Sequence, residues 1–176
     1  MAVSVALDNL LDYTDWERQK WLQWMRQRDE SVLGISAGPH GDGRFESTGE
    51  LVRHIFSAEK RYVERLSDRP LTDTATIPAD NIEALFQFGA QSRRELREFI
   101  AVFPPGNWDN PREFNILNSL LTATPGKIVV HILLHEIRHW AQISTVFRMH
   151  GLKDDFHDFL FSPVTGALII KHAEND

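Results

Sequence analysis

Hydrophobic residues recur at alternating spacings of three and four in four separate stretches of this chain. Such spacing places apolar side chains on one face of an α-helix. The pattern predicts helices over residues 6–28, 47–66, 80–103 and 125–150. Four amphipathic helices of roughly 20 residues favour an all-α fold, a four-helix bundle that forms one domain over residues 1–176. The segments between the helices predict long connections.

The remaining segments have weaker patterns. Apolar residues between 107 and 123 fit neither the helical nor the strand period, so this part is predicted as loop with a short strand or a helical turn. Residues 154–170 predict a short C-terminal capping helix and a tail. In that segment Phe156, Phe159, Leu160 and Phe161 are expected to cover one end of the bundle.

Several helix boundaries are marked by residue type. Capping boxes of the form Ser/Asp-x-x-Glu stand at residues 47–50 and 80–83. Thr124 is a suitable N-cap, and Pro125 follows at the first helical position, where its missing N–H has no cost. Gly151 follows the last turn, as expected of a C′ residue.

Two of the helices carry unusual residues on or near their apolar faces. In the first helix, Trp16, Trp21 and Trp24 indicate core anchors or, alternatively, the wall of a ligand site, whereas Arg18 is expected to face solvent. In the third helix, Gly89 and Ser92 interrupt the apolar face. Their small size permits close approach of a neighbouring helix or leaves a cavity.

Composition narrows the class of protein. The 176 residues are 42% hydrophobic with a formal net charge of −6, and no basic patch stands out, so no nucleic-acid partner is expected. No apolar run is long enough to span a membrane, and the N-terminal stretch lacks the basic region of a signal peptide. The chain has no Cys, which excludes disulfides, thiolate ligands and a cysteine nucleophile. A cytoplasmic protein without a membrane partner is expected.

The helix predicted over residues 125–150 contains two histidines on an apolar face. His135 and His139 lie one turn apart among Ile128, Ile132 and Val146. A buried histidine is commonly neutral and hydrogen-bonded. Two imidazoles on one inward face can instead both be satisfied by one divalent metal ion.

This pair belongs to the sequence His-Glu-Ile-Arg-His, which matches the H-E-x-x-H signature of metallopeptidases. The metzincin continuation is missing, because Gln142 and Thr145 stand where Gly and His would be required. Glu136 is a weak candidate for a catalytic general base. The alternative is a carboxylate that forms a salt bridge or supports the metal ligands.

A metal site requires a third protein ligand. The downstream candidates do not stand in a helical context, so the ligand is expected upstream. His54 lies beside the apolar face of the second helix, one turn before Ala58, whose small side chain leaves space for an ion.

These segments resemble the DinB-like (DinB/YfiT-like) family of metal-binding four-helix bundles. The resemblance rests on the Trp-bearing first helix, on the segment LVRHIFSAEKRYVERL and on the segment HILLHEIRHWAQI. It implies a three-histidine metal site at His54, His135 and His139, with zinc or nickel as the expected ion. The family commonly has His-Arg-Gly-Gln at the last ligand. Here Gln142 is retained to support the ligands, whereas Trp140 stands in place of Arg and is expected to alter dimer packing or access to the site.

The family resemblance also implies a homodimer, with exposed Trp and Phe residues of the first and fourth helices at the interface. Some members of the family are transferases that use low-molecular-weight thiols. A metal-dependent thiol S-transferase is thus one hypothesis, with a small-molecule thiol and an electrophile as partners. A non-catalytic metal-binding bundle in stress response or assembly is the second, and an H-E-x-x-H metallopeptidase is the third.

Overall fold

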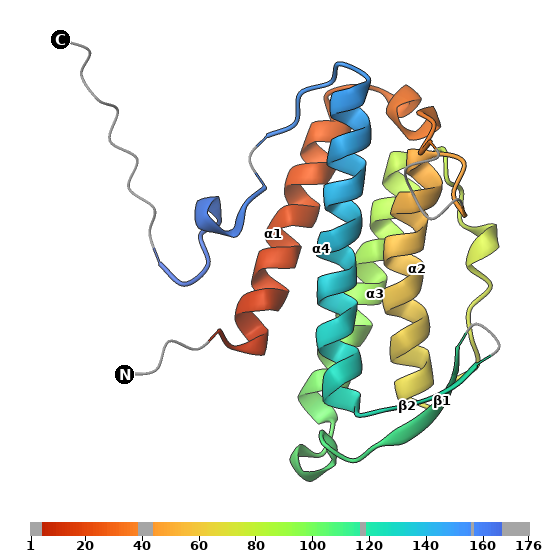
Figure 1. Ribbon diagram of the computed structural model, residues 1–176, viewed down its shortest axis with the longest axis vertical. Coiled ribbons are helices and arrows are strands. Elements are labelled where there is room, and N and C mark those ends of the chain that lie inside the picture. Colours follow the sequence, from red (N-terminus) through yellow and green to blue (C-terminus); the bar gives the residue numbers. More distant parts are fainter. Residues whose placement is uncertain (1–4, 39–43, 117–118, 156, 167–176) are drawn as a thin grey trace.

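The computed structural model describes residues 5–38, 44–116, 119–155 and 157–166 (Figure 1). Four helices form a bundle: α1 (Leu7–Arg26), α2 (Thr48–Leu66), α3 (Ile82–Val102) and α4 (Pro125–Met149). Helix α4 packs against α1 and α2, and α3 packs against α1 and α2. The predicted all-α four-helix bundle is therefore confirmed. None of the helices in the described part of the chain is long and apolar enough to cross a membrane.

The connections differ from those of a simple up-and-down bundle. Helices α1 and α4 run in one direction, and α2 and α3 run in the other (Figure 1). The segment between α2 and α3 must therefore return along the length of the bundle before α3 begins. It contains one 3₁₀ turn at Thr74–Thr76.

A β-hairpin lies between α3 and α4. Its strands, β1 (Arg112–Ile116) and β2 (Ser119–Ala123), pair antiparallel with Phe114 opposite Leu121. For this segment a short strand or a helical turn was predicted. The structure has strand rather than helix, and it forms two strands instead of one. Phe114 is buried against the core, so the hairpin closes one end of the bundle (Figure 1).

The predicted caps are mostly confirmed. The hydroxyl of Ser47 accepts a hydrogen bond from the Glu50 N–H, and Thr124 caps α4 in the same way. Gly151 ends α4 with a φ of 76°, a conformation that other residues rarely adopt. The exception is α3. Its N-cap is Asn81 rather than Asp80, because the Asn81 side chain accepts a hydrogen bond from the Ala84 N–H at 2.7 Å.

Most of the tryptophans are core residues. Trp21, Trp24 and Trp140 are buried, and Trp21 stacks on Trp140 with ring centroids 5.4 Å apart. Phe147 of α4 is buried as well. Because they are buried, these four aromatic residues are not among the exposed Trp and Phe side chains expected at a subunit interface. The effect of Trp140 on dimer packing or on access to the site stays a prediction. The homodimer itself stays a prediction.

Gly89 allows α2 and α3 to approach closely, which is one of the two predicted alternatives. A β-carbon at this position would lie 2.8 Å from ring atoms of Phe56. Phe56 is fully buried, and the atoms that a β-carbon would meet include Cγ, at the base of the ring. The Gly89 carbonyl also accepts a hydrogen bond from Arg18 at 2.9 Å.

Replacing Gly89 by Ala is therefore expected to destabilise the protein. Overpacking a core costs ~1–3 kcal/mol, which exceeds the gain of ~1 kcal/mol that alanine provides inside a helix. Urea unfolding should show a lower free energy of unfolding than for wild type. Gly106→Ala is the control, since nothing lies within 4 Å of a β-carbon there. A stabilised Gly89→Ala protein would contradict the packing described.

The C-terminal segment differs from its prediction. The described residues of this segment form only a 3₁₀ turn at Phe159–Phe161, and Leu160 is exposed. The segment runs along α1 rather than over the end of the bundle. The Tyr13 hydroxyl donates to the carbonyl of His157 at 2.6 Å, and the His157 ring stacks on Trp21. Phe156 and residues 167–170 lie outside the described residues.

Candidate metal centre

Three histidines from two helices meet on one side of the bundle. Helix α2 supplies His54, and α4 supplies His135 and His139 from successive turns. We call His54, His135 and His139 the histidine cluster. The Nε2 atom of His135 lies 3.2 Å from Nε2 of His54 and 3.0 Å from Nε2 of His139. The ligand atoms of the three residues all lie within 4.8 Å of one another.

These separations suit shared coordination of one ion. Nitrogens bound at ~2.0–2.1 Å lie about 3.3–3.4 Å apart in a tetrahedral site, and neighbouring ligands lie about 2.8–3.0 Å apart in an octahedral site. The observed 3.0 and 3.2 Å fall between these values. Within the described residues, no other group of His, Cys, Asp or Glu brings three such atoms together.

Gln142 orients His139. It follows one turn later on α4, and its Oε1 atom contacts Nδ1 of the His139 ring. The carboxamide oxygen can only accept, so Nδ1 is the donor and carries the proton. The Nε2 lone pair of His139 is then directed at the cluster. The Gln142 side chain thus contacts one member of the histidine cluster, and its role in supporting a metal ligand stays a prediction.

The environment of His135 keeps its ring neutral. The pKa of His135 is lowered to about 3, first by burial and then by the neighbouring His139 and His54 rings. His131 is also close, with its ring centroid 5.5 Å from that of His135. Burial lowers the pKa of His131 as well, and Arg138 acts in the same direction. Neutral imidazole is the form that binds metal ions.

This lowered pKa predicts acid sensitivity of the metal-free protein. Unfolded His135 takes up a proton near pH 6.5, whereas the folded residue does so only near pH 3. Between these values the unfolded state binds more protons, so the free energy of unfolding should fall as pH decreases from about 6.5 towards 3. Urea unfolding in EDTA at several pH values measures this loss. The free energy of unfolding of a His135→Gln variant should fall less over that range. If it falls by the same amount as in the wild type, His135 is not the source of the acid sensitivity.

Glu136 of the H-E-x-x-H sequence points into the bundle core. Its Oε1 accepts from Arg18 Nε at 2.6 Å and from Trp140 Nε1 at 3.1 Å. Its Oε2 accepts from Arg18 Nη2 at 2.8 Å and from Arg93 Nη2 at 2.7 Å. Although burial acts in the opposite direction, the two guanidinium groups hold the pKa of Glu136 below its usual value.

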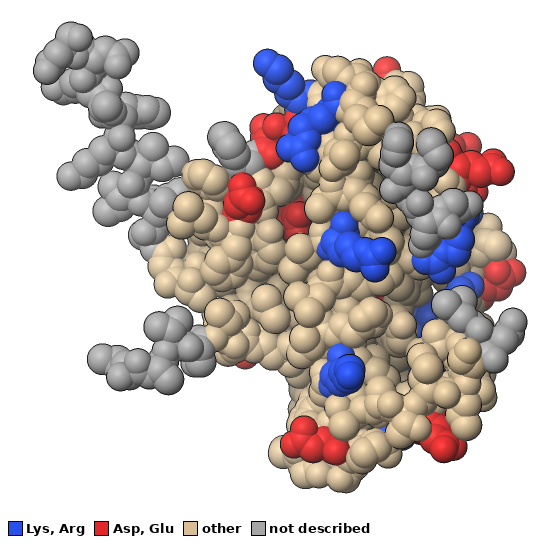
Figure 2. Space-filling model, viewed as in Figure 1, with Lys and Arg blue, Asp and Glu red and all other residues tan. Residues whose placement is uncertain are grey.

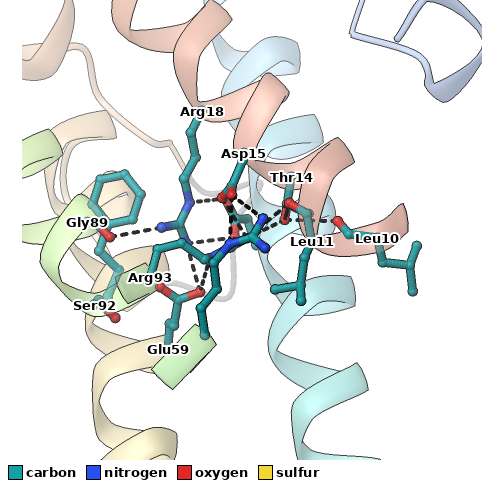
Figure 3. Close-up of polar contacts among 12 residues, drawn as sticks. Leu10, Leu11, Thr14, Asp15, Arg18, Glu59, Gly89, Ser92 and Arg93 are labelled. Atoms are coloured by element: carbon teal, nitrogen blue, oxygen red, sulfur yellow. Dashed lines mark hydrogen bonds and ion pairs between the residues drawn. The ribbon is translucent and has the colours of Figure 1, made fainter. Parts of the chain in front are cut away.

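Glu136 belongs to a buried layer of charges with one member from each helix. Arg18 of α1 and Arg93 of α3 both also contact Glu59 Oε2, at 3.0 and 2.9 Å, as Figure 3 shows. We call Arg18, Glu59, Arg93 and Glu136 the charge layer. Along each helix its member lies between the two apolar clusters of the core. The expectation that Arg18 faces solvent is wrong, since only 7% of the residue is exposed.

The charge layer bears on the metallopeptidase hypothesis. A general base needs a lone pair within reach of a metal-bound water. Both carboxylate oxygens of Glu136 are already bonded to Arg and Trp donors in the core. The geometry therefore favours the salt-bridged role of Glu136 over the catalytic one.

The charge layer has a signature in the sequence. Arg18 stands seven residues after Leu11 and three before Trp21, so it occupies a core position of the first helix. Glu59 and Arg93 occupy similar positions between apolar residues. One charge at a core position of each helix, two positive and two negative, is a pattern that predicts mutual pairing.

The histidine cluster opens to a cavity. About 370 Å³ in volume, it is lined by the three histidines, by Ala58 beneath His54 and by residues of the hairpin. Tyr62 and His131 also line this cavity. The Tyr62 hydroxyl lies 3.4 Å from Nε2 of His131. A ligand in this cavity could reach the histidine cluster directly.

Fold and site together define a class: a four-helix bundle with a histidine cluster that is open to a cavity and could hold a metal ion. The family model of the DinB superfamily matches residues 13–143. The chain therefore belongs to the DinB superfamily, as the resemblance of its helices indicated. A comparison with curated proteins found no match.

Proposed function

We propose that His54, His135 and His139 bind one divalent metal ion, zinc or nickel, through their Nε2 atoms. The convergence of these atoms from two helices carries the proposal. Imidazole is a suitable ligand for both ions. The lowered pKa of His135 and the orientation of His139 by Gln142 support it, because both present an unprotonated nitrogen.

We further propose that the centre serves a metal-dependent transferase with a low-molecular-weight thiol as cosubstrate. Three neutral imidazoles leave the charge of the ion uncompensated and at least one coordination position open, which is typical of catalytic sites. A bound ion lowers the pKa of a coordinated water or thiol. Because the chain has no Cys, the thiol must come from another molecule, and the adjoining cavity offers space for it.

The transferase is tested by the rate at which a thiol displaces bromide from an electrophile such as monobromobimane. A C–S bond forms as the C–Br bond breaks, and the thiol proton passes to solvent. With a suitable thiol, the metal-loaded protein should exceed the uncatalysed rate by on the order of tenfold or more, because coordination converts the thiol to its nucleophilic form. EDTA treatment or His135→Ala should abolish the gain. Metal binding without any rate gain across a panel of thiols and electrophiles would instead support a non-catalytic metal-binding bundle.

A further inference from the structure

The cavity above the histidine cluster is lined by arginines. Arg61 and Arg65 come from successive turns of α2, Arg138 precedes His139 on α4, and Arg44 comes from the segment before α2. None of the described residues that line the cavity is Asp or Glu. A cluster of positively charged side chains without acidic neighbours in the lining is unexpected in a protein with a net charge of −6.

The contacts of Arg61, Arg65 and Arg138 leave their positive charge without a carboxylate partner among the described residues. Arg61 donates from Nη2 to the hydroxyl of Thr74 at 3.1 Å, and Arg65 donates from Nε to the carbonyl of Asn115 at 3.3 Å. Both acceptors are neutral. Within the described chain, neither residue lies within 4 Å of a carboxylate oxygen, and the same holds for Arg138.

Several arginines elsewhere in the chain are instead paired with carboxylates. Arg18, Arg93 and Arg97 each pair with two or more carboxylates. Figure 2 shows blue groups over the middle of α4 and beside α2, whereas most red groups lie towards the edges of this view. Burial lowers the pKa of Arg65, and the positive charge of Arg61 acts in the same direction, whereas Tyr62 and Glu64 raise the pKa. The cavity therefore concentrates positive charge beside the histidine cluster.

We propose that this cavity binds an anionic cosubstrate, with its carboxylate or tetrahedral oxyanion on Arg61, Arg65 and Arg138 and its thiol directed at the histidine cluster. The inference rests on the proposed metal centre and adds the chemical class of its ligand. Guanidinium groups bind carboxylates and oxyanions through paired, charge-assisted hydrogen bonds. A cationic thiol would meet repulsion from the arginines and from the ion.

The test uses the protein loaded with Co²⁺, whose visible absorption changes when a thiolate coordinates. Four small thiols of similar size serve as probes. Two are anionic, 3-mercaptopropionate and 2-mercaptoethanesulfonate, and they distinguish a carboxylate from a tetrahedral oxyanion. 2-Mercaptoethanol is neutral and cysteamine is cationic. At least one anionic thiol should bind about tenfold or more tightly than 2-mercaptoethanol, with cysteamine weakest, and added salt should reduce the difference.

Substitutions assign the preference to the arginines. Arg61→Gln and Arg138→Gln should each reduce the ratio of the affinity for the anionic thiol to the affinity for 2-mercaptoethanol at least threefold. The cobalt content should stay at one ion per chain. Arg94→Gln is the matched control, because it removes the same charge from an exposed residue of α3 that lines a different cavity. Its ratio should equal that of wild type.

The outcomes separate this inference from the metal centre on which it depends. If wild type binds no cobalt, the proposed centre fails, and the inference fails with it. If cobalt binds but all four thiols bind equally, or the anionic ones do not bind, only the anionic preference is overturned. A preference that survives both arginine substitutions would also overturn the assignment to these residues.

Discussion

Replacing His54 by alanine is expected to weaken metal binding as severely as replacing His135 or His139. His54 is the only one of the three that comes from α2, and its Nε2 lies 3.2 Å from that of His135. Losing residues that merely support metal ligands costs about 10–100-fold in affinity, so losing a ligand should cost on the order of 100-fold or more. Titration with Zn²⁺ and Ni²⁺ against a competing chelator measures the change.

A suitable control keeps the fold and removes a histidine elsewhere. His150 is exposed at the end of α4, where its Nδ1 contacts the Val146 carbonyl at 2.9 Å, and His150→Ala should retain wild-type affinity. His157 is less suitable because it stacks on Trp21, and His40 lies outside the described residues. Full metal occupancy in a folded His54→Ala protein would rule out the three-histidine site.

The second large effect is expected at Glu136. Glu136→Gln removes the negative charge that Arg18 and Arg93 share within the core, while the shape of the side chain is preserved. Removing one partner of a buried ion pair costs ~3–5 kcal/mol, because the remaining charges cannot be hydrated. Urea unfolding at pH 7.5 should show this loss, and the folded variant should still bind one metal ion.

Glu83→Gln provides the matched control. Glu83 forms a salt bridge with Arg26 at 2.6 Å, but both side chains are largely exposed. Exposed pairs contribute only ~0–1 kcal/mol, so the same chemical change should have little effect there. Equal stability losses in the two variants would show that the charge layer has no special role. Peptide cleavage by the wild type that folded, metal-bound Glu136→Gln has lost would instead revive the metallopeptidase hypothesis.

The parts of the fold that were predicted correctly depend on local signals. Helix α4 begins at Pro125 as expected, because Thr124 and Pro125 are adjacent in sequence and act within one turn. The start of α3 was misplaced by a residue or two because Asp80 and Asn81 can both cap a helix, and only the path of the preceding loop selects Asn81. The hairpin was ambiguous for a similar reason: its strands are stabilised by pairing with each other and by packing of Phe114.

In the candidate site, too, some features follow from local sequence and others only from tertiary contacts. The i, i+4 relation of His135 and His139 follows from helix geometry alone, and Ala58 pointed to space beside His54. The arginines of the cavity come from α2, α4 and the segment before α2, so their positions along the chain showed no basic patch. The charge layer was missed for the same reason, since each helix contributes a single member.

By itself, the sequence determined the four helices, most of their boundaries and the pair of histidines on α4, because spacing and capping act over one or two turns. It also indicated His54 as the candidate for the third metal ligand. Only the tertiary structure decided that Glu136 turns into the core, that Arg18 is buried and that positive charge gathers at the cavity. These features depend on which helices become neighbours. A buried charge must find a partner across the bundle, and that partner can lie more than a hundred residues away in the chain, as Glu136 does from Arg18.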